Sequence, residues 1–299
     1  MPGHFKLGVI GGTGVGALLS SLAPGEPVRH EVVTPFGRPS APVLESEVDG
    51  LSVLVLPRHG EGHRNNPTQV PYRANVMALK MLGVTHLLAT GAVGSLREEI
   101  RPRELVLVDS FIDRTHQRSG TFFDSAAVHV DFAEPTCPVL RQLALEAAGG
   151  LEGVKVHERG TYVCMEGPSF STRAESLMHR LLGGDVIGMT ALPEARLARE
   201  AEMGYLLIAL ATDWDCWKPH AAGTTPQSLL QEIISNVQSA SASAMRLLEA
   251  TVRLAASRAE TLGTSPALTA LDHALWTDRT AIPPHEVERL RPLWGRLFA

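Results

Sequence analysis

Cysteine, aromatic residues and long apolar runs are all scarce in this chain of 299 residues. The three cysteines, Cys137, Cys164 and Cys216, are far apart and odd in number, so they predict neither a disulfide framework nor a redox-active pair. We expect reduced thiols, packed as small buried hydrophobic side chains, in a cytoplasmic protein. No apolar run approaches the ~20 residues that span a bilayer. The first residues also lack the apolar stretch and cleavage site of a secretory signal.

A basic excess is also missing, because 27 lysines and arginines stand against 32 aspartates and glutamates and the net charge is −5. Nucleic acids and acidic membrane surfaces favour a basic face, so we expect neither as a partner. Hydrophobic residues make up 44% of the chain and charged residues 20%, which is typical of a globular protein with a sizeable core. The sequence shows no repeat, low-complexity linker or domain boundary, and we therefore predict one domain over residues 1–299.

Short apolar runs alternate with stretches of helical periodicity. This alternation predicts an α/β fold with a central, largely parallel or mixed sheet flanked by helices. A long helix is expected to start at Pro226 with Thr225 as its N-cap, and a final helix, Pro284–Leu297, is expected to form a C-terminal helical tail. The strands are expected at residues 7–10, 51–56, 86–89, 105–108, 185–187 and 205–211, and the other helices at 69–82, 139–148, 172–182 and 191–201.

Glycines follow the first expected strand in the run GGTG at residues 11–14. Such a turn directs backbone N–H groups toward an anion, and Thr13 adds a hydroxyl donor. From Gly12 the run also fits a GxGxxA variant of the dinucleotide fingerprint, with Glu31 about 20 residues further on. A Pro-Gly pair at 24–25 shortens the helix that this second interpretation requires. A tight turn without any ligand is the third interpretation.

The run PRHGEGH at residues 57–63 follows the second expected strand. Ligands of open α/β sheets lie beyond the carboxyl ends of strands. Arg58 offers a planar fork of donors beside His59, and this pair suits an oxyanion such as phosphate. A metal site is the weaker alternative, because the glycines make this segment a loop instead of the helix of an HExxH motif. A solvated loop without function also remains open.

Two further strand ends and one turn carry candidate residues. The run ATGAVGS at 89–95 is a third candidate cradle for an anion, since small residues allow close backbone approach. Met189 and Thr190 follow another expected strand. A Gly-Pro turn presents Phe170, which either stacks on a base or packs in the core.

Asp213 and Asp215 end the most apolar strand of the chain, in the run ATDWDCW. Side chains two residues apart in a strand point the same way, so these carboxylates are expected to converge on one ligand. A partly buried carboxylate beside another one has a raised pKa, as a general acid near neutral pH requires. Helix capping or a surface position is the alternative interpretation of both residues.

Taken together and in this order, these segments resemble the 5′-methylthioadenosine phosphorylase branch of the purine nucleoside phosphorylase family. The resemblance covers roughly residues 5–257 and includes TPFGRPSAPV, RHGEGH, YRANVMALK, GSLREEIRP, DSFIDRT, AEPTCP, EGPSFSTRAES and ATDWDCW. It implies a nucleoside phosphorylase fold, and trimers or hexamers with sites at the subunit interfaces. We expect a homotrimer in which His129 reaches the site of a neighbouring subunit.

The resemblance also implies the residues of the site. Phosphate would be held by Thr13, Arg58, His59, Gly91, Ala92 and Thr190. The purine and ribose would meet Phe170, Met189, Asp213 and Asp215, and the 5′ substituent would meet Pro226, Leu229 and Leu230. Gly91 stands where some relatives carry a second threonine, and Pro226 replaces a β-branched residue. These two departures alter the phosphate site and the 5′ pocket.

The implied reaction is phosphorolysis of a 5′-substituted adenine nucleoside, foremost 5′-methylthioadenosine, to adenine and a 5-substituted ribose 1-phosphate. Asp213 would protonate or hydrogen-bond N7, and Asp215 would tune that acid or position the base. Inorganic phosphate is the co-substrate, and no metal or organic cofactor is expected.

Several alternatives stay open. Another 5′ group, such as that of 5′-deoxy-5′-fluoroadenosine, fits the same apolar pocket. A 6-oxopurine nucleoside phosphorylase is disfavoured by Asp213, because a 6-oxo group requires a donor. A dinucleotide-binding oxidoreductase rests only on residues 12–17, and a nucleoside-binding module without catalysis is more distant still.

Overall fold

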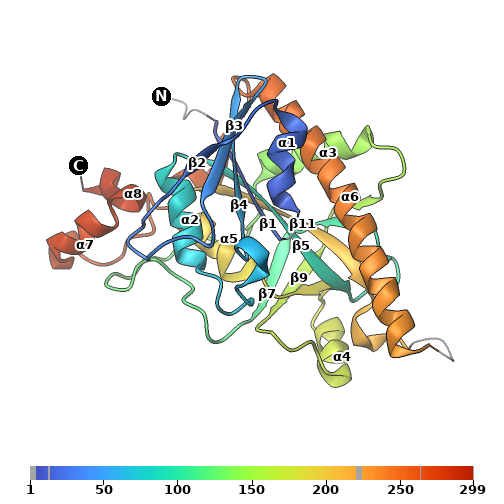
Figure 1. Cartoon of the computed structure of the whole chain (residues 1–299). Coiled ribbons are helices and arrows are strands. Elements are labelled where there is room, and N and C mark those ends of the chain that lie inside the picture. The colour runs from blue at the N-terminus through green and yellow to red at the C-terminus, as the bar shows by residue number, and fades with distance from the viewer. Residues whose placement is uncertain (1–4, 13, 220–223, 263, 299) are drawn as a thin grey trace.

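The fold is built on the parallel pairing of β1 (Leu7–Gly11) with β4 (Leu51–Pro57) on one side and β5 (His86–Ser95) on the other. The structure, a computed structural model, describes residues 5–12, 14–219, 224–262 and 264–298. β11 (Gly204–Asp213) pairs with β5 in parallel from His86 to Gly94, with a register shift between Ala211 and Asp213. These strands are largely buried, and they form the centre of the molecule (Figure 1).

Within the described residues the sheet has eleven strands in the order β2-β3-β4-β1-β5-β10-β9-β7, with β11, β6 and β8 branching from β5. The branch arises because the far end of β5 pairs antiparallel with β10 while still pairing with β11. Parallel and antiparallel pairs therefore occur together, and the predicted α/β fold with a mixed sheet is confirmed. The remaining strands are β2 (Val28–His30), β3 (Val43–Val48), β6 (Leu105–Leu107), β7 (Ser110–Arg114), β8 (Val156–His157), β9 (Thr161–Met165) and β10 (Val186–Gly188).

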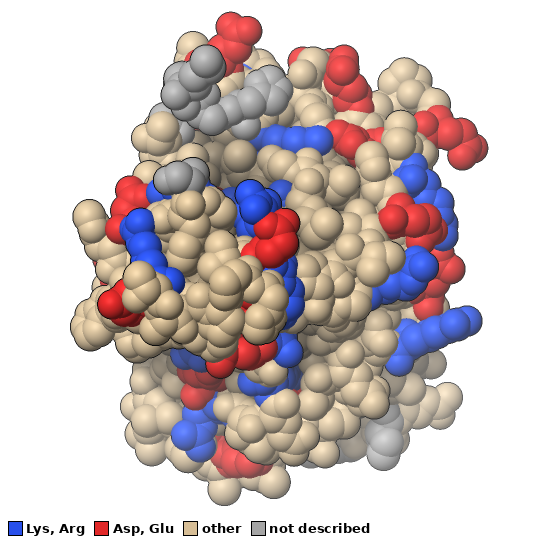
Figure 2. Space-filling view, turned by 90° about the vertical axis from the view of Figure 1, so that its left-hand side faces the viewer, with Lys and Arg blue, Asp and Glu red and all other residues tan. Residues whose placement is uncertain are grey.

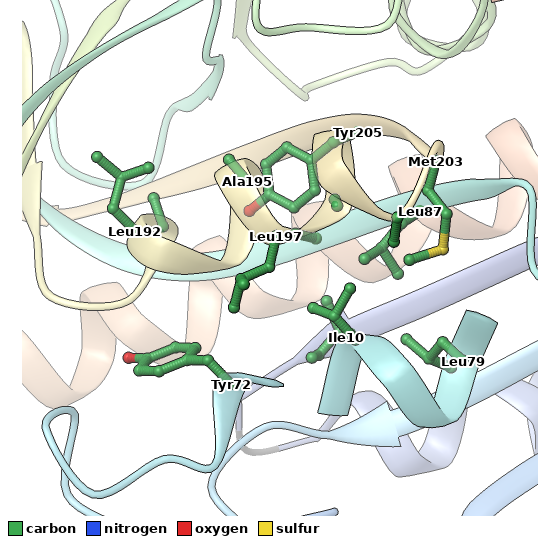
Figure 3. Close-up of a cluster of buried hydrophobic side chains, with 14 of the residues drawn as sticks. Ile10, Tyr72, Leu79, Leu87, Leu192, Ala195, Leu197, Met203 and Tyr205 are labelled. Atoms are coloured by element: carbon green, nitrogen blue, oxygen red, sulfur yellow. The ribbon is translucent and has the colours of Figure 1, made fainter. Parts of the chain in front are cut away.

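Helices cover both faces of the sheet, because successive strand residues point to opposite faces. Ile10 packs into one core with α2 (Tyr72–Met81) and α5 (Ala191–Glu200), as Figure 3 shows. The neighbouring residues Leu7 and Val9 pack into a second core on the opposite face. The helices of that second face are α1 (Leu18–Leu22), α3 (Pro138–Gly149) and α6 (Pro226–Arg258).

The long helix α6 begins where its sequence predicts. Thr225 accepts a hydrogen bond from the N–H of Ser228 and Pro226 occupies the first helical position, so the predicted start is confirmed. α4 (Arg173–Leu181) opens on the same kind of capping box, formed by Thr172 and Glu175. Among the helices of the described residues, none is long and apolar enough to cross a membrane.

The predicted C-terminal helical tail is confirmed, but the prediction of a single helix over Pro284–Leu297 is wrong. The chain forms α7 (Pro284–Arg289) and α8 (Arg291–Trp294), followed by the 3-10 turn η6 (Gly295–Leu297), and it leaves helical geometry at Leu290. Pro292 explains the break, since a proline inside a helix lacks a donor and clashes with the preceding turn. The tail still packs on the body, because Arg296 pairs with the buried Glu202 and Trp294 is buried.

Two other expectations also need correction. The run at 89–95 is not a loop after a short strand, because β5 continues through it to Ser95. Strands β2, β3, β7, β8 and β9 lie in segments where no strand is predicted. Polar residues interrupt the apolar runs of β3 and β7, and β2 and β8 have only three and two residues. Shorter 3-10 turns connect the elements, at η1 (Val15–Ala17), η2 (Glu61–His63), η3 (Asp215–Trp217), η4 (Pro266–Thr269) and η5 (Arg279–Ala281).

Candidate functional site

The predicted phosphate residues and the two aspartates come from β5, from the carboxyl ends of β1, β4 and β11, and from the segment after β10. The glycine turn after β1 adjoins the Arg58 loop, because the N–H of Arg58 donates to the carbonyl of Gly11 at 2.8 Å. Thr13, the hydroxyl donor predicted in that turn, lies outside the described residues. The first two motifs are thus neighbours in space as well as in the predicted site.

Arg58 is buried, with a side chain only 1% exposed, and forms an ion pair with Glu194, which is 0% exposed. Its Nε and Nη2 donate to the two carboxylate oxygens of Glu194 at 2.7 and 2.8 Å, and its Nη1 donates to the carbonyl of Thr90 at 2.8 Å. Burial opposes the charge of Arg58, but the Glu194 carboxylate outweighs it and raises the pKa. Arg58 is therefore a fixed cation whose fork is largely occupied by protein atoms.

His59 lies beside Arg58 and is 8% exposed. Its Nδ1 donates to the carbonyl of Asn65 at 2.8 Å, and its ring stacks on His63 with centroids 4.1 Å apart. Burial, Arg58 and His63 together lower its pKa to about 4. Without a bound anion the ring is therefore neutral at physiological pH, and Nε2 is an acceptor that suits the O–H of a monoprotonated phosphate.

The remaining phosphate candidates meet where β5 passes Thr190. A Cβ atom built on Gly91 would lie 3.5 Å from the Thr190 hydroxyl oxygen, so this glycine leaves room for an anion beside that hydroxyl. Ala92 is exposed and Gly91 half-buried, whereas Thr190 is buried. The N–H of Thr190 donates to the Tyr162 hydroxyl at 3.3 Å. A larger residue at 91 would narrow this gap.

Asp213 is held in place by two donors. Its Oδ1 accepts from the Thr212 hydroxyl at 2.8 Å and its Oδ2 accepts from the N–H of Asp215 at 2.9 Å. Burial raises the pKa of the Asp213 carboxyl and the neighbouring Asp215 adds to the shift, whereas the two hydrogen bonds oppose it. Asp213 thus combines a fixed orientation with an increased proton affinity, as a general acid requires.

Asp215 lies beside Asp213, but the prediction that both side chains point the same way from one strand is wrong. The two residues do not share a strand face, because β11 ends at Asp213 and Asp215 begins η3 with a φ of 49°. Burial raises the pKa of the Asp215 carboxyl, against the nearby Ser176 hydroxyl. Gly94 makes the arrangement possible, since a Cβ there would lie 3.1 Å from Cβ of Asp215 and 3.4 Å from Oδ2 of Asp213.

The Phe170 loop adjoins this carboxylate pair. Cys216, which follows Asp215, donates its thiol to the carbonyl of Ser171 at 3.2 Å. Phe170 itself is 85% exposed, so it is available to stack on a base and does not pack in the core. At the base of the loop, a Cβ on Gly167 would lie 2.6 Å from Sδ of the half-buried Met189.

The N-terminal part of α6 borders the end of β11, because Asn236, ten residues after Pro226, donates to the carbonyl of Thr212 at 3.0 Å. Leu229 is half-buried and Leu230 is 58% exposed, which leaves apolar surface on the first turns of this helix. Pro226 opens this helix, and its side chain is outside what the structure describes.

His129 is exposed and belongs to a different neighbourhood. Its N–H donates to the carbonyl of Ala274 at 2.8 Å, and its ring packs edge-on against Trp276 with centroids 4.8 Å apart. The contacts of His129 are thus with the C-terminal segment and not with the other predicted site residues. A metal-binding cluster of three or more His, Cys, Asp or Glu is also absent from the part of the chain that the structure describes.

Comparison with known proteins identifies the family. The sequence pattern of the phosphorylase superfamily matches residues 6–253. The chain is 46% identical over 292 residues to the S-methyl-5′-thioadenosine phosphorylase of Geobacter sulfurreducens, covering 97% of this chain and 98% of that protein. The chain belongs to the phosphorylase superfamily. The family predicted from the sequence motifs is therefore confirmed.

Other similar proteins agree with this family assignment. The chain is 47% identical over 244 residues to the S-methyl-5′-thioadenosine phosphorylase of Danio rerio, across 80% of this chain and 86% of that protein. Its fold is similar to a methylthioadenosine phosphorylase from an Antarctic soil metagenomic library, with a TM-score of 0.87, 40% identity and 97% and 98% of the two chains covered. The Schistosoma mansoni methylthioadenosine phosphorylase bound to tubercidin gives a TM-score of 0.74 and 37% identity, with 85% and 92% covered.

Sequence reasoning missed three charged residues of this phosphorylase superfamily protein. Glu194 neutralises Arg58 from 136 positions away, and Glu166 and Arg118 form a second buried pair. Pairing over such distances leaves no periodic signal in a single sequence. The cue available for Glu194 was that an acidic residue stands in the first turn of the otherwise apolar start of α5.

Proposed function

We propose that this protein catalyses the phosphorolysis of a 5′-substituted adenine nucleoside, foremost 5′-methylthioadenosine. The products are adenine and 5-methylthioribose 1-phosphate. The similarity over nearly the whole chain to proteins named S-methyl-5′-thioadenosine phosphorylase supports the reaction. The carboxylate of Asp213, at the carboxyl end of the central strand β11, is the observation that carries the choice of base.

Asp213 supplies the general acid. Cleavage of the C1′–N9 bond leaves negative charge on adenine, and protonation of N7 offsets that charge as the bond breaks. The raised pKa of Asp213 helps it to hold a proton for this step. The same carboxyl group accepts a hydrogen bond from the 6-amino group. A 6-oxo purine presents no donor there, and leaving one buried polar group unpaired costs about 1–3 kcal/mol.

Phosphate acts as both stabiliser and nucleophile. Its negative charge favours the oxocarbenium-like ribose, and one of its oxygens then bonds to C1′ as the bond to N9 breaks. Thr13, Arg58, His59, Gly91, Ala92 and Thr190 are proposed to hold it. Arg58 contributes mainly as a fixed charge, since Glu194 occupies much of its fork. Neither a metal nor an organic cofactor enters this reaction.

The nucleoside is proposed to lie between Phe170 and Met189, with Asp215 positioning the base beside Asp213. Leu229, Leu230 and Pro226 face the 5′ substituent in this proposal, which favours an apolar group such as a methylthio group. The apolar surface at Leu230 supports that assignment. The dinucleotide interpretation loses support, because the helix after the glycine turn has only five residues and Glu31 pairs with Arg29 at 3.0 Å.

We also propose a homotrimer, or else a hexamer, in the cytoplasm. His129 is then the residue that reaches the neighbouring site, and its exposed position supports this. Small molecules are the expected partners. On the described surface shown in Figure 2, basic and acidic side chains are interspersed and form no broad basic field of the kind that nucleic acid favours.

Product analysis tests the proposed function. The purified protein is incubated separately with 5′-methylthioadenosine, 5′-deoxy-5′-fluoroadenosine, adenosine and methylthioinosine, with and without inorganic phosphate, and free base is followed by chromatography. We expect adenine release that requires phosphate and is fastest with 5′-methylthioadenosine. Base release from methylthioinosine alone would contradict the role of Asp213, and no base release from any substrate would refute the phosphorylase assignment for this chain.

A further inference from the structure

A second buried ion pair lies beside the candidate site and has no part in the mechanism above. The side chain of Arg118 is 1% exposed and that of Glu166 is 9% exposed, with 3.0 Å between Nε and Oε1. Burial alone would raise the pKa of Glu166. Hydrogen bonds from the N–H groups of His116 and Gln117, from Thr68 and from Arg118 instead lower it to about 2. Glu166 is therefore ionised at neutral pH.

The other donors of Arg118 go mainly to backbone carbonyls. Nη1 donates to the carbonyls of Met189 at 2.5 Å and Leu192 at 2.7 Å, and Nη2 donates to the carbonyl of Glu166 at 2.5 Å. In a trans peptide the carbonyl of Met189 points opposite to the N–H of Thr190. By holding that carbonyl, Arg118 also sets the direction of the backbone at the predicted phosphate residue Thr190.

The same guanidinium thus joins two segments that carry different parts of the proposed site. One is the turn from Glu166 to Phe170, which presents the aromatic ring proposed to stack on the base. The other is the Met189–Thr190 segment, proposed to meet ribose and phosphate. These segments also touch directly, since a Cβ on Gly167 would lie 2.6 Å from Sδ of Met189. A shift of one segment therefore displaces the other.

Glu166 extends the connection to the loop that carries His59. Its Oε1 accepts from the Thr68 hydroxyl at 2.7 Å, and its Oε2 accepts from the N–H groups of His116 at 2.7 Å and Gln117 at 3.1 Å. Thr68 lies three residues after Asn65, and the carbonyl of Asn65 accepts the hydrogen bond that orients the His59 ring. Three loops of the proposed site therefore converge on one ion pair.

We propose that Arg118 is a positioning residue, which acts through Glu166 and the carbonyls of Met189 and Leu192 to align the bound nucleoside with phosphate. It does not touch the reacting atoms. The inference rests on the proposed phosphorolysis. It further requires a guanidinium group at position 118, and not only a positive charge. Arginine offers several donors in a planar fork, whereas lysine offers a single ammonium group that cannot reach Glu166 and three carbonyls together.

Arg118→Lys tests this role, because it keeps the charge and loses the fork. A reacting atom misplaced by about 1 Å costs on the order of 100-fold in rate. We expect kcat on 5′-methylthioadenosine to fall by that factor while KM for nucleoside and for phosphate changes much less. Tyr72→Phe is a milder second variant, because it removes only the hydroxyl that Arg118 contacts at 3.1 Å and keeps the buried ring. It should lower kcat in the same selective way.

Arg199→Lys is the matched control. Arg199 is also buried and also donates to two backbone carbonyls, those of Asp131 at 2.9 Å and Glu134 at 2.5 Å, but neither belongs to the three loops. The kcat of Arg199→Lys should stay near that of the unmodified protein, even if its melting temperature falls as much as that of Arg118→Lys. An equal loss of kcat in Arg199→Lys, or unchanged kcat in both Arg118→Lys and Tyr72→Phe, would overturn the proposal.

A binding measurement tests the proposal without requiring catalysis. Free adenine and inorganic phosphate occupy opposite ends of the proposed site, so coupling between them passes through the protein. Calorimetric titration of adenine should show binding tightened by roughly fivefold or more when phosphate is present, and Arg118→Lys should abolish most of this effect. Coupling that is absent in the unmodified protein or intact in the variant refutes the positioning role. Missing adenine release by the unmodified enzyme refutes only the proposed function.

Discussion

The carboxyl group of Asp213 is the side chain on which the choice of base depends. Asp213→Asn preserves its size but removes the transferable proton and offers an amide where an acceptor is needed. We expect kcat/KM for 5′-methylthioadenosine to fall by about 10²–10⁴-fold, the contribution of a positioned acid. Initial rates of adenine release at saturating phosphate provide the measurement, and methylthioinosine in parallel shows whether 6-oxo substrates are admitted.

Asp49→Asn is the control for this substitution. Asp49 is exposed in the turn between β3 and β4 and has a φ of 49°, a conformation that asparagine also tolerates. It should leave adenine release unchanged. Full activity of Asp213→Asn on the adenine substrate would remove Asp213 from the acid role.

The Arg58–Glu194 pair supports a second prediction, about stability and phosphate together. Glu194→Gln leaves a buried guanidinium without its counter-ion, so we expect the free energy of unfolding to fall by about 3–5 kcal/mol. If Arg58 faces the bound phosphate, added phosphate should restore part of that stability and raise the melting temperature of the variant more than that of the unmodified protein. Thermal unfolding with phosphate, and with sodium chloride at equal ionic strength, measures this. Equal shifts in both proteins would place the anion away from Arg58.

At the scale of single residues, the sequence indicated candidates that follow strands but did not indicate residues that pair across the fold. Arg58, His59 and Asp213 stand out because each comes at a strand end, where ligands of α/β proteins bind. Glu194, Arg118 and Glu166 matter through their partners, which lie 136 and 48 positions away in the sequence. Nothing in a single sequence records those partners.

At the scale of elements, the last part of β5 is built from small residues so that the end of β11 can approach it. Gly94 lies directly opposite Asp213 in the strand pairing. Gly94→Ala would place a Cβ 3.1 Å from Cβ of Asp215 and 3.3 Å from Cγ2 of Ile187. We expect a loss of about 1–3 kcal/mol in stability from this overpacking, together with reduced kcat/KM because both aspartates are displaced.

Gly149→Ala is the matched control for Gly94→Ala, since a Cβ at position 149 meets no atom within 4 Å. It should leave both activity and stability close to their original values. Denaturant unfolding and adenine release are measured on the same preparations. Unchanged activity in Gly94→Ala would show that the carboxylate pair tolerates the displacement.

Apolar runs predicted the central strands but not strands such as β3 and β7, which lie away from the centre of the sheet. β1, β4 and β11 are buried on both faces and read as continuous apolar stretches, as expected for interior parallel strands. β3 and β7 carry partly exposed polar residues, and their runs VLESEV and SFIDR therefore do not stand out. The proline at 292 was visible in the sequence, and the rule that proline breaks a helix would have divided the predicted final helix correctly.

At the scale of the whole molecule, the strand order could not be predicted, because the sheet branches at β5. Several long-range contacts hold the surrounding segments to the body. Glu202 at the end of α5 accepts from the N–H of Leu271 at 3.0 Å and pairs with Arg296 of the tail. Two positions earlier, Glu200 accepts from the N–H of Phe122 at 2.8 Å. The end of α5 thus anchors two distant segments through buried carboxylates.

Glu200 makes the stability of the whole molecule depend on pH. It is 5% exposed, and burial raises its pKa to about 7, above the ordinary value near 4.5. Between these two pH values the folded protein holds a proton that the unfolded chain releases, so stability falls as the pH rises from about 4.5 to about 7. The full loss amounts to about 3 kcal/mol above that range.

Glu200→Gln removes this titration and keeps an acceptor for the Phe122 N–H. The difference in unfolding free energy between the variant and the unmodified protein should therefore shift in favour of the variant by about 2.5 kcal/mol from pH 5 to pH 8. Urea unfolding of both proteins at several pH values measures the difference, and exposed Glu260→Gln serves as a control that should show no such trend. A difference between variant and unmodified protein that stays constant across this range would mean that Glu200 is already ionised in the folded state. The buried carboxylate would then have to be stabilised by more donors than the Phe122 N–H and its neighbours supply.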